Sequence, residues 1–414
     1  MNGYLLFIVG IIITHSLLDL IVSLLNLRSL SPYLPKEFVG IYEEKEYGRS
    51  QDYTRVTTRF SLIENTVSTV AMLLFILLGG FNALDLFARS FHFPPVFTGL
   101  LFIGVLAFLT GALNLPFGIY STFVIEERFG FNKTTVKTFI LDLLKGVILS
   151  ILLGAPLLGG ILWFFEAVGT MAWLYCWGAV VLFSLVMQFL APVVIMPLFN
   201  TFTPLEEGTL KENITSYAQE QKFGLKGIYT MNGSKRSTRA NAFFTGFGPF
   251  RRIVFFDTLL NKITDAELLA ILAHEMGHYK KKHIFKMLAA STLQTGIMFY
   301  ILSFFLDNQR LFAAFGMEHL SIYAGLVFFS FLYSPISTLL SIAFNVVSRK
   351  HEYEADAFAA ETTGLADSLI SGLKKLSVTN LSNLTPHPLN VLLNYSHPPV
   401  LDRIKALKTG EDGG

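Results

Sequence analysis

Residues 172–196 read AWLYCWGAVVLFSLVMQFLAPVVIM, a stretch without a charged side chain. As an α-helix it is long enough to cross the roughly 30 Å of hydrocarbon in a bilayer. Similar apolar stretches occur at about 5–27, 66–87, 97–120, 140–164, 286–306 and 321–346. The sequence therefore predicts a mainly α-helical membrane protein with seven transmembrane helices, and kinks or early exits at Pro116, Pro192 and Pro197.

The composition of the whole chain excludes several other classes of protein. Only 15% of the 414 residues are charged, against roughly 25% in a soluble protein, whereas 52% are hydrophobic and 14% are aromatic. The same values exclude a disordered chain. A single cysteine excludes an intramolecular disulfide framework. The net charge of +2 gives no sign of a nucleic-acid partner.

The charged residues are concentrated in two segments. Residues 198–283 and 349–414 carry 20 and 15 of them, whereas residues 284–348 carry only 4. We therefore expect a membrane region of five helices (1–197), a soluble segment (198–283), a pair of membrane helices (284–348) and a second soluble segment (349–414). The loop at 28–59 contains six Lys and Arg residues, so the positive-inside rule places both soluble segments in the cytoplasm.

The first soluble segment carries a metal-binding motif. Residues 264–282 read TDAELLAILAHEMGHYKKK, in which Thr264 and Glu267 form a capping box that starts a helix. His274 and His278 lie one turn apart on that helix. This H-E-x-x-H spacing is typical of zinc hydrolases, in which the two histidines bind the metal and the glutamate, here Glu275, acts as general base.

A catalytic zinc ion usually takes a third protein ligand. The segment SRKHEYEADAFA (348–359) continues the seventh apolar stretch, and helical spacing places Glu352 and Asp356 on one face, with Glu354 turned away. Glu352 is then the candidate third ligand, and Asp356 is the candidate acceptor for the second N–H of a ligating histidine. His283 and His351 fall outside this pattern and are expected to be interfacial or solvated.

Three short runs predict a small β-sheet in the same segment. They cover residues 228–232, 241–246 and 253–257, with a turn at Gly246-Phe247-Gly248-Pro249. An extended peptide could pair with the edge of such a sheet and present its backbone to the metal.

Taken together, the motifs resemble the type I CAAX prenyl endopeptidases, which are seven-span zinc metalloproteases that remove the last three residues of prenylated proteins. The similarity extends over nearly the whole chain. It includes EEKEY (43–47) with RFSLI (59–63), IEERFGFNKTT (125–135), SKRSTRANAFFTG (234–246) and YSHPP (395–399). The resemblance implies one zinc ion per chain, held by His274, His278 and Glu352, with Glu275 as the base that activates water for attack on the peptide bond.

The resemblance also implies roles for three residues around the metal. Asn241 would hold the substrate backbone, His397 would stabilise the oxyanion, and Arg403 would be a basic residue near the site, with binding of a C-terminal carboxylate as a hypothesis. The implied partners are a prenylated or membrane-associated peptide and the lipid bilayer. The implied location is the endoplasmic reticulum membrane in a eukaryote and the inner membrane in a prokaryote. A short sixth loop and a C-terminus without a dilysine pair favour a prokaryotic or divergent member.

Two other functions remain open from the residues. A membrane quality-control metalloprotease without a prenyl requirement shares the H-E-x-x-H chemistry, although such relatives have fewer spans and lack the Ser-His-Pro-Pro feature. A transporter or scaffold with a structural zinc ion would not need Glu275. The sequence does not specify the natural substrate, the preferred prenyl group or the oligomeric state.

Overall fold

The computed structural model describes residues 2–246 and 251–410. Within that part of the chain, seven helical segments are long and apolar enough to cross a membrane, which confirms the predicted number. They are built from α1 (Gly3–Arg28), α2 (Glu44–Leu77), α4 (Pro95–Tyr120), α5 (Val136–Leu149) with α6 (Ala155–Ala167), α7 (Ala172–Leu190) with α8 (Met196–Phe199), α12 (His283–Leu302) and α14 (Ile322–Thr363).

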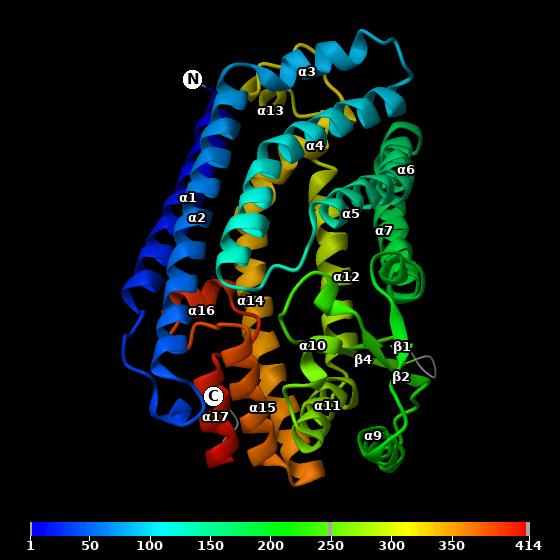
Figure 1. The fold of residues 1–414 in the computed structure, drawn as a ribbon. Helices are drawn as coiled ribbons and strands as arrows, with labels where there is room; N and C mark the ends of the chain where they lie inside the picture. Colours follow the sequence, from blue (N-terminus) through cyan, green and yellow to red (C-terminus); the bar gives the residue numbers. More distant parts are fainter. Residues whose placement is uncertain (1, 247–250, 411–414) are drawn as a thin grey trace.

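Shorter helices connect these spans or lie beyond them. They are α3 (Gly80–Arg89), α9 (Thr209–Glu220), α10 (Asp257–Leu260), α11 (Asp265–Lys280), α13 (Gln309–Ala314), α15 (Ala366–Thr379), α16 (Pro388–Asn394) and α17 (Val400–Thr409). Figure 1 shows that α1 begins at the opposite end of the molecule from α17. The helices α11, α15 and α17 gather with the small sheet at this second end.

The second span differs from the expected range of 66–87. Helix α2 begins at Glu44 and ends at Leu77, and residues 80–89 form the separate helix α3. Gly79 stops α2 because it takes a left-handed conformation with φ of 74°. The hydrophobic stretch marks the part of α2 that can lie in a membrane, but a backbone signal sets where the helix ends.

Three spans contain a π-helical turn, at Ser121–Glu126, Ser150–Gly154 and Ala191–Ile195. Pro192 lies in the last of these turns, where the missing N–H of proline disturbs the regular hydrogen-bond ladder. Pro116 lies inside α4 without ending it. The predicted kink at Pro192 therefore takes the form of a wider turn, and neither Pro116 nor Pro192 causes an early exit.

The described residues form one four-stranded sheet in the order β1-β2-β4-β3. Its strands are β1 (Phe202–Pro204), β2 (Gly227–Met231), β3 (Ala242–Thr245) and β4 (Arg252–Phe256). Strands β2 and β4 are parallel, and the other two pairs are antiparallel. The three predicted strands are confirmed, whereas β1 is too short to show an alternating pattern. Residues 247–249 of the predicted turn lie outside the described part of the chain.

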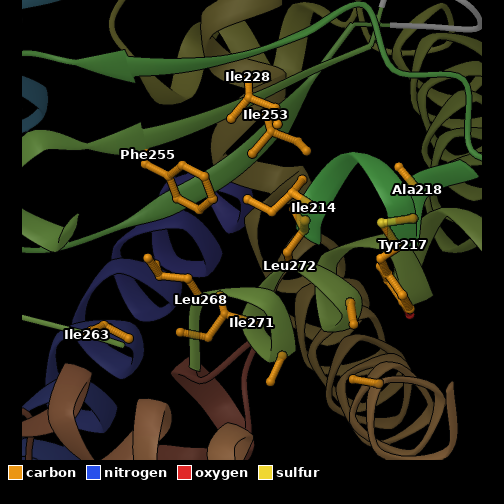
Figure 2. Close-up of a cluster of buried hydrophobic side chains, with 14 of the residues drawn as sticks. Ile214, Tyr217, Ala218, Ile228, Ile253, Phe255, Ile263, Leu268, Ile271 and Leu272 are labelled. Atoms are coloured by element: carbon orange, nitrogen blue, oxygen red, sulfur yellow. The ribbon is translucent and has the colours of Figure 1, made fainter. Parts of the chain in front are cut away.

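A buried apolar cluster joins this sheet to α11 (Figure 2). Ile253 and Phe255 of β4 lie opposite Leu268 and Leu272 of α11, and all four side chains are almost fully buried. Each side chain of this size stabilises the fold by about 1.5–3 kcal/mol when it is fully buried. The cluster therefore holds the helix that carries the H-E-x-x-H motif against the sheet.

Candidate metal centre

Helix α11 begins with the predicted capping box. Thr264 N donates to Glu267 Oε2 (2.8 Å), and Glu267 N donates to Thr264 Oγ1 (3.4 Å). Glu267 also accepts hydrogen bonds from Ser371 (2.6 Å) and Lys375 (2.8 Å) of α15. Because these contacts satisfy the buried carboxylate, the start of the motif helix is fixed to α15.

The structure brings together His274 and His278 of α11 and Glu352 of α14. One possible ligand atom from each residue lies within 4.8 Å of the other two. The two Nε2 atoms are 3.3 Å apart, and the Glu352 carboxylate lies 3.2 Å from His278 Nε2 and 3.5 Å from His274 Nε2. Two nitrogen ligands bound to one tetrahedral zinc ion are also roughly 3.4 Å apart, since each lies about 2.0–2.1 Å from the metal.

The Glu352 carboxylate provides a further test of whether a cation fits. Its Oε2 atom is buried and forms no hydrogen bond of regular geometry among the described residues, although Arg403 Nη1 lies 3.3 Å and His274 Nε2 lies 3.5 Å away. Buried polar atoms are rarely left unpaired. Two imidazoles and one carboxylate are also a common ligand set for catalytic zinc. The residues present therefore fit a zinc ion.

A buried ion pair lies behind His274. His274 Nδ1 is 2.8 Å from Asp356 Oδ1, and Arg403 donates to Asp356 through Nε (2.8 Å) and Nη2 (2.6 Å). Burial by itself lowers the pKa of Arg403, but the Asp356 carboxylate more than offsets this and raises that pKa, so the guanidinium stays charged. Arg403 therefore already holds a carboxylate of its own chain.

The expectation that His283 and His351 are interfacial or solvated is wrong. His283 is only 3% exposed, and its Nδ1 lies 3.0 Å from His278 Nδ1 while its Nε2 lies 2.9 Å from Glu354. His351 is also buried, and its ring stacks on His283. The helical extrapolation fails because Lys282 takes a left-handed conformation (φ 59°) between α11 and α12. The change of chain direction at Lys282 brings the His283 ring beside the His278 ring.

The remaining predicted residues surround a small cavity. Glu275, Asn241, His397 and Arg403 line a space of about 100 Å³ together with His274 and Glu352. Glu275 is half-buried and Asn241 is exposed just before β3. His397 is 66% exposed at its side chain, and its Nε2 lies 3.5 Å from Glu352.

A second cavity of about 730 Å³ shares His397 and Arg403 with the first. Its wall includes Arg239, and it also includes Tyr53 and Thr57 of α2, which sequence reasoning missed. These two α2 residues follow no motif spacing, so only the folded structure reveals their place. The small cavity at the candidate metal centre therefore adjoins a larger space.

Gly277 sets how closely α11 approaches α14. A Cβ atom added to Gly277 would lie 3.0 Å from Cα and 3.2 Å from the carbonyl oxygen of Ala355. Neither backbone atom can move aside without shifting its helix. The absence of a side chain at Gly277 thus lets Glu352 reach the two histidines.

Comparisons with known proteins identify the family of the chain. Residues 23–201 match the family described as CAAX prenyl protease N-terminal, five membrane helices, and residues 204–411 match peptidase family M48. A CAAX prenyl protease 1 homolog from Oryza sativa subsp. japonica is 37% identical over 391 residues, which cover 92% of this chain and 91% of the relative. CAAX prenyl protease 1 from Saccharomyces cerevisiae is 34% identical, covering 92% and 89%.

A solved structure extends the similarity to the fold. The crystal structure of S. mikatae Ste24p superposes with a TM-score of 0.93 at 32% identity, covering 98% of this chain and 99% of that one. The matched family models account for both the membrane helices and the segment that carries the metal centre. The chain therefore belongs to the CAAX prenyl proteases of peptidase family M48 and is a multi-pass membrane metalloprotease.

Proposed function

We propose that this protein removes the C-terminal tripeptide from prenylated proteins, using one zinc ion held by His274, His278 and Glu352. The observation that carries the proposal is the convergence of these three side chains beside Glu275 in one cavity. The names of its relatives supply the substrate class, since they are CAAX prenyl proteases.

The chain's own residues can perform the remaining steps of hydrolysis. A bound zinc ion supplies Lewis acidity that polarises the scissile carbonyl and makes water more acidic. Glu275 lines the same cavity and takes the proton of the attacking water, then returns it to the leaving amine. His397 is exposed to the cavity and donates to the oxygen on which negative charge develops.

The sheet offers a place for the substrate backbone. Strand β3 is at the edge of the described sheet and pairs only with β4 there. A substrate paired antiparallel to β3 directs its C-terminal residues toward Asn241, at the start of the strand, and toward the larger cavity beyond it. The described lining of that cavity contains no Asp or Glu. Its Arg239 lies 3.1 Å from Glu126 and its Arg403 holds Asp356, so a C-terminal carboxylate would share these arginines with carboxylates of the chain.

We also propose that the metal centre faces the cytoplasm. The basic segment 28–59, which includes the first turns of α2, lies at the same end of the molecule as the metal centre, because its Phe38 and Tyr47 pack against Leu384 and Ile404. The positive-inside rule places such a segment in the cytoplasm. The membrane is then that of the endoplasmic reticulum in a eukaryote, or the inner membrane in a prokaryote.

A matched pair of peptides tests the substrate. Purified protein is incubated with a farnesylated CaaX peptide and with the same peptide lacking the prenyl group. We expect release of the tripeptide from the prenylated peptide alone, loss of activity with a chelator and recovery with Zn²⁺. Equal cleavage of both peptides would favour a quality-control protease, and zinc binding without cleavage of either would favour a structural metal.

Zinc affinity is expected to depend steeply on pH. Burial by itself lowers the pKa of His274, but its hydrogen bonds to Asp356 and Glu352 more than offset this and raise the pKa to about 9 in the metal-free site. Zinc binds neutral imidazole, so binding below that pH displaces a proton. We expect the dissociation constant, measured by chelator competition, to fall about tenfold per pH unit as the pH rises toward 9.

The raised pKa of His274 also makes the stability of the metal-free protein depend on pH. This stability falls as the pH rises, whereas zinc affinity increases. The raised pKa of His274 stabilises the fold fully below the ordinary value of 6.5, and the stabilisation is lost as the pH rises through about 9.

Asp356→Asn is the control for the pH dependence of zinc affinity. Loss of the carboxylate charge lowers the pKa of His274, so the pH range over which the zinc dissociation constant changes steeply moves to lower pH. An affinity that does not change with pH would contradict the assigned shift.

Gly277→Ala is expected to weaken zinc binding and to lower the free energy of unfolding by about 1–3 kcal/mol, because overpacking separates α11 from α14. Chelator competition and thermal unfolding measure the two effects. Gly48→Ala on α2 is the matched control, since a Cβ there meets no atom within 4 Å. Unchanged zinc affinity in Gly277→Ala would mean that this helix crossing does not set the ligand geometry.

A further inference from the structure

The two histidines of the motif have different partners on the side away from the metal. His274 Nδ1 lies 2.8 Å from the Asp356 carboxylate. His278 Nδ1 instead lies 3.0 Å from Nδ1 of another imidazole, His283, whose Nε2 lies 2.9 Å from Glu354 Oε2. We infer that His283 and Glu354 are positioning residues that fix the tautomer and the ring orientation of His278, an inference that rests on the proposed function.

The positions of the nitrogen atoms determine where each proton lies. His278 Nε2 faces His274 and Glu352, so a neutral His278 that offers this nitrogen to a metal carries its proton on Nδ1. That proton points at His283 Nδ1, which must therefore accept it, because two N–H groups cannot face each other at 3.0 Å. His283 then carries its own proton on Nε2 and donates it to Glu354.

The surroundings of His283 hold this chain of hydrogen bonds in place. His283 is 3% exposed, and its ring lies flat on the His351 ring with centroids 3.9 Å apart and an interplanar angle of 7°. The three bonded residues come from three helices, since His278 belongs to α11, His283 begins α12 and Glu354 belongs to α14. Two of these helices are membrane spans, so the orientation of His278 depends on how α12 and α14 pack.

The test compares zinc affinity in two phenylalanine variants. His283→Phe keeps a flat ring against His351 but removes the acceptor for His278, and we expect a zinc dissociation constant about 10–100 times higher. His351→Phe is the matched control, because it keeps the stacked ring and leaves the hydrogen bonds intact; we expect less than about a threefold change. Chelator competition measures both constants, and the absorption spectrum of the Co²⁺ form reports on ligand geometry.

Two further variants test Glu354, the last residue in this chain of hydrogen bonds. Glu354→Leu leaves His283 Nε2 without an acceptor and should weaken zinc binding, whereas Glu354→Gln retains an acceptor oxygen and should recover most of the affinity. The inference is overturned if His283→Phe binds zinc as tightly as the unmodified protein. It is also overturned if both phenylalanine variants lose affinity equally, since packing would then be the cause.

Control measurements separate this inference from the proposed function. Thermal unfolding of each metal-free variant shows whether the fold is intact before zinc is added. Failure of the unmodified protein to bind zinc would refute the metal centre itself. Normal zinc binding and peptide cleavage by the unmodified protein, with unchanged affinity in His283→Phe, would refute only the positioning role.

Discussion

Replacing Glu275 with Gln is expected to lower kcat for prenylated peptide cleavage by about 10²–10⁴-fold while zinc stays bound, because a positioned general base contributes a factor of this size. The amide has nearly the shape of the carboxylate but cannot accept the proton of the attacking water. Glu275 lines the same cavity as His274 and Glu352 without belonging to the cluster of possible metal ligands. Steady-state kinetics and the zinc content of the purified variant measure the two effects.

A ligand variant serves as the comparison for this experiment. His274→Ala should lose both zinc and activity, since it removes one of three possible ligands. If Glu275→Gln kept full activity with zinc bound, another group would have to serve as the base. If it lost zinc, the residue would be acting on the metal rather than on the water.

Replacing Arg403 with Met is expected to lower the free energy of unfolding of the metal-free protein by about 3–5 kcal/mol. The side chains of Arg403 and Asp356 are only 10% and 3% exposed, and Arg403 Nη1 also lies 3.3 Å from Glu352. Removing the cation leaves two buried carboxylates with His274 as their remaining partner, and breaking a buried pair costs about this much. Denaturant unfolding measures the change.

Zinc binding and the second substitution Asp356→Asn should each reduce the loss of unfolding free energy that Arg403→Met causes. A bound cation neutralises Glu352, and Asp356→Asn removes the other uncompensated charge, so the double variant should be more stable than Arg403→Met alone. Lys405→Met provides a surface control on the same helix, where the effect should stay within about 0.5 kcal/mol. A loss of similar size in Lys405→Met would argue against the ion pair as the cause.

The membrane class and the motif helix could be predicted because each depends on local chemistry. A span must be apolar along its whole length, and the ligand spacing of His274 and His278 follows from one turn of helix. The same helical geometry predicts that Glu352 and Asp356 share a face, and the structure places both side chains toward His274. Such patterns need no knowledge of the rest of the chain.

The environment of the second ligand could not be predicted in this way. The positions of His278 and His283 in the sequence suggest different faces of one continuous helix, but the left-handed Lys282 divides it and reverses the relation. Similarly, Arg403 reaches Asp356 through packing of α17 on α14, which no spacing reveals. Contacts between distant segments depend on the turns that join them, and one residue can change the outcome.

The length of α14 has a consequence for how the protein is made. This single helix of 42 residues is about 63 Å long, and it carries both a membrane span and Glu352. Between His278 and Glu352 the chain must cross the bilayer along α12 and return along α14. A nascent chain therefore cannot complete its ligand set until that hairpin has been inserted. If the proposed zinc centre forms as described, metal loading therefore follows membrane insertion of α12 and α14.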